Sequence, residues 1–179
     1  MKNKKLTTYQ MAVTALMAAA LCVLGPLSVP IGAIPISLSN FVICLTAWLL
    51  GPKFGTLSVA VYLLIGLVGV PVFSGYGAGI AKLAGPTGGY LVAYPLMALV
   101  LSLVCQHFKG FVPRLVGVIL AVAVCYTFGT AWFMFMSGND LATSLAWCVT
   151  PFVIPDLIKG VCALLLAKAL ESRLNKAAA

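Results

Sequence analysis

The sequence predicts an all-α, polytopic membrane protein with six transmembrane helices and both termini in the cytoplasm. Apolar residues make up 63% of the 179 residues and charged residues only 8%, and the mean hydropathy is +1.14. A soluble domain carries about 25% charged residues, so 11 basic and 3 acidic side chains cannot cover a water-facing surface of this size. Six apolar stretches approach the roughly 20 residues that a helix needs to cross a bilayer.

Glycine and proline residues divide the chain into the predicted helices. Gly25-Pro26 ends the first apolar stretch, Gly51-Pro52 the second and Pro71 the third, because proline lacks the N–H that a helix interior requires. A short uncharged connection is expected between the first two helices, and residues 141–149 fit either a short helix or the start of the last span. The six helices are expected over residues 9–24, 37–50, 55–70, 89–105, 112–136 and 151–170.

Residues 1–179 are expected to form a single membrane domain, because no linker, low-complexity tract or internal repeat divides them. The basic N-terminus followed by an apolar run also resembles a signal peptide. Five further apolar stretches follow this run, so an uncleaved first helix is the favoured interpretation.

The distribution of charge sets the predicted orientation. Lys and Arg in short loops mark the cytoplasmic side of a membrane protein. If the N-terminus lies inside, nine of the 11 basic residues are cytoplasmic. This bias also accounts for the net charge of +8, so we expect no nucleic acid as a partner. The nine residues are Lys2, Lys4, Lys5, Lys53, Lys109, Arg114, Lys168, Arg173 and Lys176.

Two charged residues lie within the last predicted span, on its outer half. Asp156 and Lys159 are three residues apart, so they share one face of a helix. An ionisable side chain near the centre of a span costs about 2.5–3.5 kcal/mol on insertion scales. The pair therefore predicts a ligand site that opens to the outside. The alternative is a self-satisfied ion pair that only fixes the helix against its neighbours.

Residues 71–88 are too rich in glycine for a stable lipid-facing helix. Irregular backbone at membrane depth is tolerated where it is buried in protein or lines a cavity. This segment and the charged face of the last helix are expected to converge on one outer pocket, with Tyr76 and Tyr90 as flat apolar walls. Gly75 and Gly88 are candidate ligand contacts, since glycine lets a ligand approach the backbone closely. The expected ligand is small, with an anionic end and a partly apolar body that carries N–H groups.

No catalytic, nucleotide or metal motif accompanies this pocket. The sequence lacks the GxxxxGK[ST] loop that binds nucleotide phosphates, so it predicts neither ATP hydrolysis by this chain nor a cofactor. His107, the single histidine, is interpreted as interfacial. The cysteines lack metal-ligand spacing and are interpreted as small buried apolar residues. They are Cys22, Cys44, Cys105, Cys125, Cys148 and Cys162.

Short segments along nearly the whole chain carry a family resemblance. The sequences PVF at 71–73, GPTGGYL at 85–91 and PFVIPDLIK at 151–159 come first, and IPISL at 34–38 and GPKFG at 51–55 agree with them. Together they resemble the BioY family, the biotin-binding S components of energy-coupling factor (ECF) vitamin transporters. The GPTGGY and PxxxPDxxK elements in combination are specific to this resemblance.

The resemblance implies a non-catalytic S component in the bacterial plasma membrane that captures biotin from the outside with high affinity. It also implies a transmembrane coupling (T) subunit and two cytoplasmic ATPases as partners, with Ala15 and Ala19 on the first helix as docking residues. By the same resemblance, Asp156, Lys159 and Tyr90 lie in the biotin pocket. Charge would pair Lys159 with the carboxylate of biotin and Asp156 with its ureido N–H groups, unless the two side chains contact each other.

The chain departs from the family pattern at a few positions. Lys82 stands where the family usually has an apolar residue, and Ser39-Asn40 stands where it often has Gln-Thr. Three other functions remain open from the sequence. They are an S component for another small vitamin, a membrane enzyme with Asp156 and Lys159 as acid and base, and a self-sufficient proton-coupled carrier.

Overall fold

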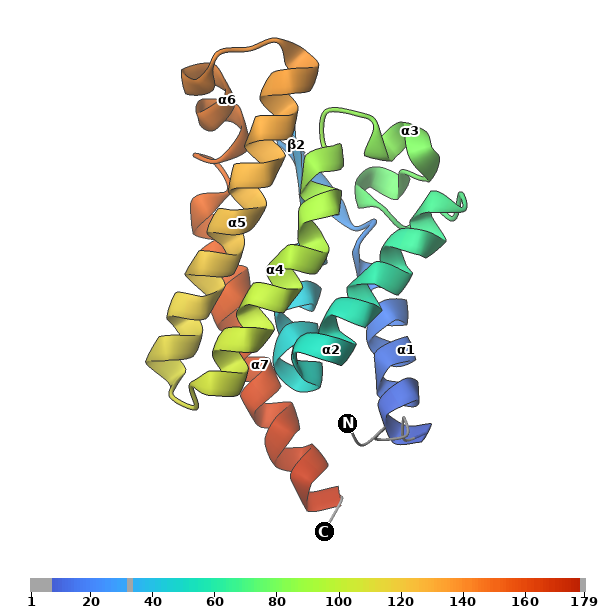
Figure 1. The fold of residues 1–179 in the computed structure, drawn as a ribbon, viewed down its shortest axis with the longest axis vertical. Helices are drawn as coiled ribbons and strands as arrows, with labels where there is room; N and C mark the ends of the chain where they lie inside the picture. The colour runs from blue at the N-terminus through green and yellow to red at the C-terminus, as the bar shows by residue number, and fades with distance from the viewer. Residues whose placement is uncertain (1–7, 32–33, 178–179) are drawn as a thin grey trace, which may run out of the picture.

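The computed structural model describes residues 8–31 and 34–177, apart from the side chains of Ile31 and of residues 172–177 (Figure 1). Lys2, Lys4 and Lys5, on which the predicted orientation partly depends, lie outside the described residues. Helices dominate the described chain. Its elements are α1 (Thr8–Leu24), β1 (Ser28–Ile31), β2 (Ile34–Ser37), α2 (Ser39–Leu67), the 3₁₀ turn η1 (Ser74–Tyr76), α3 (Gly79–Leu83), α4 (Gly88–His107), α5 (Phe111–Ser137), α6 (Leu141–Cys148) and α7 (Val153–Ala177).

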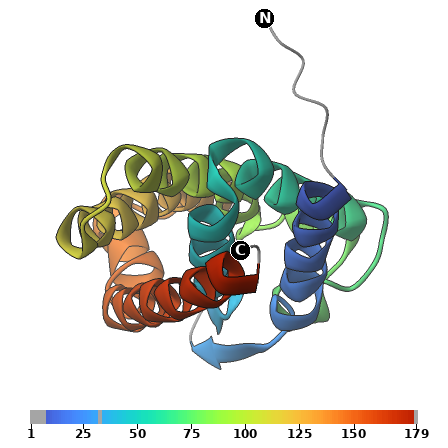
Figure 2. The same cartoon turned by 90° about the horizontal axis from the view of Figure 1, so that it is seen from below.

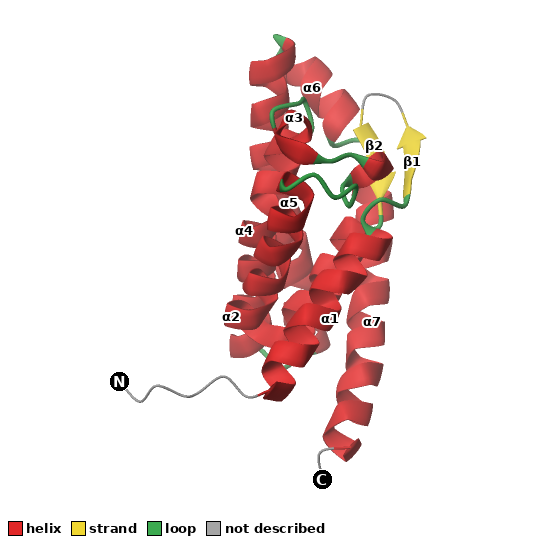
Figure 3. Cartoon of the chain, turned by 90° about the vertical axis from the view of Figure 1, so that its right-hand side faces the viewer, coloured by secondary structure: helices red, strands yellow, loops and turns green. Residues whose placement is uncertain are grey.

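The long helices run roughly along the long axis of the molecule, and the chain turns back at the two ends of the bundle (Figures 1 and 3). α1 begins at the lower end of Figure 1 and leads to the β1–β2 hairpin in the upper half. The bend in α2 and the α4–α5 turn lie at the lower end, where α7 also ends. The hairpin, α3 and α6 therefore occupy one end of the molecule, opposite the start of α1 and the end of α7.

The break in α2 lies where the sequence predicts the boundary between two helices. Gly51 has φ 71° and ψ −175°, a backbone region that is essentially restricted to glycine. Pro52 then begins the second half of α2, because a first helical position needs no N–H donor. The two halves correspond to the helices that the sequence predicts over 37–50 and 55–70.

The short uncharged connection after α1 forms a β-hairpin, a structure that the sequence did not predict. β1 and β2 pair antiparallel, with Val29 opposite Ile36 and Pro30 opposite Pro35. Proline cannot donate to a strand ladder, which argued against strands here. A two-stranded ribbon has two open edges, so proline can stand where its missing N–H would face outward.

Residues 71–88 form a folded cap and, as predicted, no long helix. Phe73 is fully buried and meets Tyr62 of α2 edge to face, with ring centroids 5.6 Å apart. The indole N–H of Trp132 on α5 donates to the carbonyl of Gly85 at 3.0 Å. A side chain at Gly88 would collide with the backbone carbonyl of Leu83, so glycine is required where the cap enters α4.

The last apolar stretch is divided into two helices. α6 and α7 are separated by a short break and meet at a bend of 44°, so residues 141–149 form the short helix that the sequence left as one of two options. In the described chain α2, α4 and α5 are each long and apolar enough to cross a membrane. The bent α6–α7 pair passes the same test as a unit, and α1 is a shorter apolar helix of 17 residues.

The core lies between α2, α4, α5 and α7, with Met97 and Leu101 of α4 fully buried at its centre. Buried hydroxyls join the helices. Ser58 donates to the carbonyl of Thr14 at 2.8 Å, and Ser102 donates to that of Ala47 at 3.0 Å. Lipid is as apolar as the core, so close packing and interhelical hydrogen bonds hold such bundles together.

The cysteines follow the sequence interpretation only in part. All six are free thiols. Cys44, Cys125 and Cys148 are buried as expected, and Cys22 and Cys105 are half-buried. Cys162 is exposed on α7, so its interpretation as a buried residue was wrong. An apolar stretch in a membrane protein does not reveal which of its faces meets lipid.

Candidate ligand-binding site

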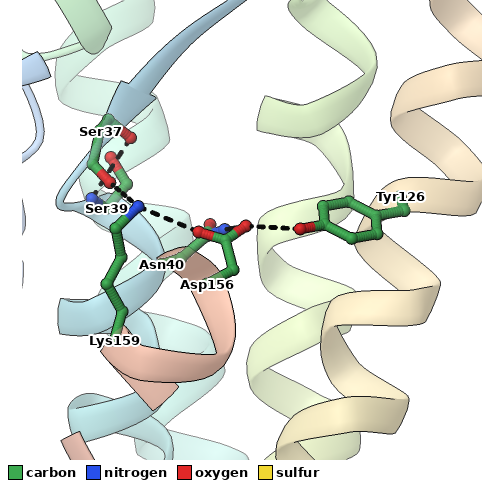
Figure 4. Close-up of polar contacts among 6 residues, drawn as sticks. All are labelled: Ser37, Ser39, Asn40, Tyr126, Asp156 and Lys159. Atoms are coloured by element: carbon green, nitrogen blue, oxygen red, sulfur yellow. Dashed lines mark hydrogen bonds and ion pairs between the residues drawn. The ribbon is translucent and has the colours of Figure 1, made fainter. Parts of the chain in front are cut away.

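Asp156 and Lys159 form an ion pair near the start of α7, with Lys159 Nζ 3.0 Å from Asp156 Oδ1 (Figure 4). The Asp156 side chain is only 3% exposed and that of Lys159 14%. The other carboxylate oxygen of Asp156 accepts hydrogen bonds from Asn40 Nδ2 and Tyr126 Oη, each at 2.9 Å. Lys159 also donates to the backbone carbonyl of Ser37 at 2.8 Å.

These contacts join α7 to three other elements. Ser37 ends β2, Asn40 lies in the first turn of α2, and Tyr126 lies in the middle of α5. A buried charge is expensive unless it is paired and hydrogen-bonded, and this network meets that condition for both members of the pair. The network therefore fixes the two charged side chains in place before any ligand arrives.

The network leaves hydrogen-bonding capacity unused. A lysine ammonium has three N–H donors and a carboxylate about four acceptor positions. Within the described residues Lys159 uses two donors and Asp156 three acceptor positions. Asn40 Oδ1 is buried and has no partner there. One N–H donor thus lies close to unfilled oxygen acceptors, and a buried polar atom without a partner requires an explanation.

The unfilled groups line a pocket at the end of the bundle that carries the hairpin. The space between its walls, including the open mouth, is about 530 Å³. Ile34, Leu91 and Phe152 contribute apolar surface, and Tyr90, Tyr94 and Tyr126 contribute aromatic rings. A pocket that combines apolar and aromatic walls with a few fixed polar groups suits a small amphipathic molecule.

Residues 1–176 match the model of the BioY family. The chain belongs to the BioY family. The resemblance read from the sequence motifs is therefore confirmed, and it holds for nearly the full length of the chain.

Relatives agree with this assignment. A probable biotin transporter BioY of Pyrococcus horikoshii is 35% identical, over 90% of this chain and 96% of the relative. The biotin transporter BioY of Thermotoga maritima is 38% identical, over 85% and 90% of the two chains. A solved structure, the S-component for biotin from an ECF-type ABC transporter, superimposes with a TM-score of 0.86 at 31% identity and covers 96% of this chain and 95% of its own. The bundle is thus an S-component membrane fold.

Only some of the site residues suggested by the BioY resemblance line the pocket. Asp156, Lys159 and Tyr90 line the pocket. The Tyr90 hydroxyl donates to the carbonyl of Cys148 at 3.2 Å, which joins α4 to the end of α6. Tyr90 is therefore part of the pocket wall and also holds the α6–α7 junction in place.

Gly75, Tyr76 and Gly88 do not line the pocket in this structure. Tyr76 is 65% exposed with φ 58°. The N–H of Gly75 donates to the carbonyl of Pro26 at 3.1 Å, and Gly88 serves the close packing described above. Their neighbours Ser74 and Thr87 line the pocket instead. The glycine-rich segment thus lines the pocket, but at Ser74 and Thr87.

Asn40, Tyr126 and the carbonyl of Ser37 are site groups that sequence reasoning missed. Asn40 and Tyr126 are separated from Asp156 by 116 and 30 residues along the chain. Neither spacing produces a local pattern, so only the departure from the family at Ser39-Asn40 pointed to this position.

Ala15 and Ala19, the expected docking residues, are both exposed on α1. Ala15 also borders a shallow apolar groove between α1 and the second half of α2, which Phe54, Leu57 and Val61 line from the other side. Small side chains let a second helix approach a helix closely. The docking role of Ala15 and Ala19 stays a prediction.

Proposed function

We propose that this chain is the high-affinity, biotin-binding S component of an ECF-type vitamin transporter. Several relatives of similar length are named biotin transporters, and the solved structure with the same fold is an S-component for biotin. The observation in this chain that carries the proposal is the pocket around Lys159, Asp156 and Asn40, with one unused donor beside unfilled acceptors. The chain carries out no catalysis, in keeping with a family of transport components.

The contact between Lys159 and Asp156 changes how biotin is expected to bind. The carboxylate and the ureido group lie at opposite ends of biotin, separated by a fused bicycle and an aliphatic chain. Two side chains only 3.0 Å apart meet the same end of such a ligand. The pairing that charge suggested, with Lys159 on the carboxylate and Asp156 on the ureido ring, is therefore replaced.

The ureido ring fits the base of the pocket better than a carboxylate does. Its carbonyl can accept the third N–H of Lys159, and its N–H groups can donate to Asn40 Oδ1 and to the remaining acceptor position of Asp156. A carboxylate would find one donor but would face the acceptors of Asp156 and Asn40. We therefore place the ureido ring at Lys159, Asp156 and Asn40, with Tyr90 and Tyr126 beside the bicycle.

The carboxylate of biotin is then directed to the mouth of the pocket. Ser74 and Thr87 line the pocket, and we infer that their hydroxyls donate to the carboxylate. These two residues are flanked in the chain by Gly75, Tyr76 and Gly88. We propose that the backbone of these three residues positions Ser74 and Thr87 around the carboxylate. Gly75 and Tyr76 would reach the ligand only if the segment 71–88 moves toward the pocket.

The proposal includes a topology. The chain passes six times between the ends of the bundle if the two halves of α2 are counted separately and α6 with α7 as one passage. The lysine and arginine bias places the α4–α5 turn in the cytoplasm, and the biotin pocket then opens to the outside of the bacterial plasma membrane. The T subunit would dock on Ala15 and Ala19, and two cytoplasmic ATPases would supply the energy that this chain cannot derive from nucleotide.

Calorimetric titration of the purified chain tests the proposed function. Biotin is expected to bind with sub-micromolar affinity in the absence of nucleotide, whereas thiamine and riboflavin are expected not to compete. Absence of biotin binding by folded protein would refute the proposal, and preferential binding of another vitamin would assign a different cargo. Recovery of the bound ligand chemically unchanged argues against an enzyme.

A further inference from the structure

A second pocket lies at the opposite end of the bundle from the biotin site. It is lined by residues of the first half of α2, the end of α4, the α4–α5 turn, the start of α5 and α7. Figure 2 shows this end of the bundle from below. The pocket is open and encloses about 900 Å³ including its mouth. No step of biotin binding involves it.

Three basic side chains face this pocket, and they belong to different elements. Lys109 lies in the α4–α5 turn, Arg114 in the first turns of α5 and Lys168 on α7. The single acidic side chain of the pocket, Glu171, accepts a hydrogen bond from the indole N–H of Trp48 at 3.0 Å. No ion pair joins a basic side chain of the pocket to a carboxylate among the described residues. The pocket therefore carries a net positive charge with unfilled donors.

The guanidinium of Arg114 is fixed by its neighbours and has N–H donors available for an anion. Its guanidinium lies 3.9 Å from the centre of the Trp48 ring, and its Nε donates to the carbonyl of Phe108 at 3.2 Å. A guanidinium has five N–H donors, so the four on its terminal nitrogens stay available. A planar guanidinium fixed by stacking suits two-point recognition of phosphate.

The surroundings of the pocket favour a lipid over a soluble anion. Phe111 lines the pocket and is 40% exposed, and Phe108 and Val112 beside it are 54% and 70% exposed. Exposed apolar side chains next to cations are typical of the membrane interface, where acyl chains begin below the head groups. Basic pockets between transmembrane helices on the cytoplasmic side bind anionic head groups.

We propose that this pocket binds the phosphate head group of an anionic glycerophospholipid. The phosphate lies between Arg114, Lys109 and Lys168, and the acyl chains run along Phe111 and Val112. The site is independent of biotin, since the two pockets lie at opposite ends of the bundle. It fixes the position of the α4–α5 turn relative to α7 at the surface of the bilayer.

Native mass spectrometry of the full chain in detergent tests this proposal. The probes are phosphatidylglycerol and phosphatidylcholine with the same acyl chains, added at equal concentration. The wild type is expected to retain phosphatidylglycerol preferentially. The variant Lys109→Gln/Lys168→Gln, which changes only exposed side chains, is expected to lose about tenfold in that preference. Lys53→Gln/Lys82→Gln removes the same charge outside the pocket and should keep the preference.

The outcomes separate the possible occupants of the pocket. An equal retention of both lipids, or an unchanged preference in the Lys109→Gln/Lys168→Gln variant, would overturn the proposal. Displacement of phosphatidylglycerol by millimolar inorganic phosphate would also overturn it, because the site would then be one for soluble anions. If the variant keeps its lipid preference but no longer co-purifies with the T subunit, the pocket is a protein docking site and the lipid proposal is wrong. Thermal unfolding of each variant confirms that it is folded.

Discussion

At the scale of single residues, the proposed binding site depends on polar groups that are fixed before ligand arrives. Lys159 and Asp156 are held by Ser37, Asn40 and Tyr126 at distances of 2.8–2.9 Å. Such preorganisation lowers the entropy that binding must overcome. The charged pair was predictable, because an ionisable residue inside an apolar helix is conspicuous in a sequence. Asn40 and Tyr126 were not, since their role arises only from tertiary contacts.

Tyr126→Phe is expected to weaken biotin binding. The substitution removes the hydroxyl that donates to Asp156 Oδ2 at 2.9 Å, and a hydrogen bond to a charged group contributes about 1.5–3 kcal/mol. The loss should lie within this range, because the buried carboxylate would reorient relative to Lys159. Titration of biotin measures it. Tyr9→Phe, the same change at an exposed position on α1, should have no effect, and an equal effect of both variants would contradict this role of Tyr126.

At the scale of elements, breaks in the helices bring the site together. The hairpin supplies Ser37, the start of α2 supplies Asn40, and the break between α6 and α7 places Phe152 at the pocket. The helix ends at Gly25-Pro26 and Gly51-Pro52 could be predicted, because glycine and proline act locally. The hairpin could not be predicted in this way, because each of its strands contains a proline. A pattern of residue types cannot show that the strands pair with each other.

Gly51→Ala is expected to lower the free energy of unfolding by about 1–3 kcal/mol, because the conformation of Gly51 is strained for any residue with a Cβ. A steric clash does not contribute to this loss, since no atom lies within 4 Å of the Cβ that alanine would add. Unfolding of the detergent-solubilised protein measures the change. Lys53→Ala, two residues further on and exposed, should stay within about 0.5 kcal/mol of the wild type. Equal stability of the two variants would show that the bend does not need glycine.

Ala15→Trp is expected to abolish co-purification with the T subunit and to leave biotin affinity unchanged. A large side chain on the exposed face of α1 prevents close approach of a partner helix, whereas the biotin pocket lies at another part of the bundle. Pull-down from membranes that contain the T subunit and both ATPases provides the measurement. Ile119→Trp changes an exposed residue of α5 and serves as the control. Unimpaired co-purification of Ala15→Trp would exclude α1 as the docking helix.

At the scale of the whole molecule, the two ends of the bundle have different chemistry. The pocket with Lys159 and Asp156 lies at the end with the hairpin, and Lys109, Arg114 and Lys168 gather at the other. Composition predicted a membrane bundle, because it acts on the whole chain, and the orientation that the charges indicate stays a prediction. They could not predict which end of the ligand meets Lys159, since this depends on a contact between two side chains.

Thiol labelling of cells tests the orientation. Asp140→Cys lies before α6, at the end with the proposed biotin pocket, and Lys109→Cys lies in the α4–α5 turn. With the proposed topology, a membrane-impermeant maleimide should label Asp140→Cys in intact cells and Lys109→Cys only after permeabilisation. The wild type, with six free cysteines, gives the background. The reverse pattern would place the biotin pocket in the cytoplasm.

The most direct test of the account compares biotin with biotin methyl ester in the wild type and in Lys159→Ala. Loss of one partner of a buried, hydrogen-bonded charge pair costs about 2–5 kcal/mol. If Lys159 holds the ureido ring, both ligands should lose affinity by the same factor, since they differ only at the carboxylate. A loss confined to biotin would show that Lys159 binds the carboxylate, and unchanged affinities of both ligands would show that the pocket around Lys159 is not the binding site.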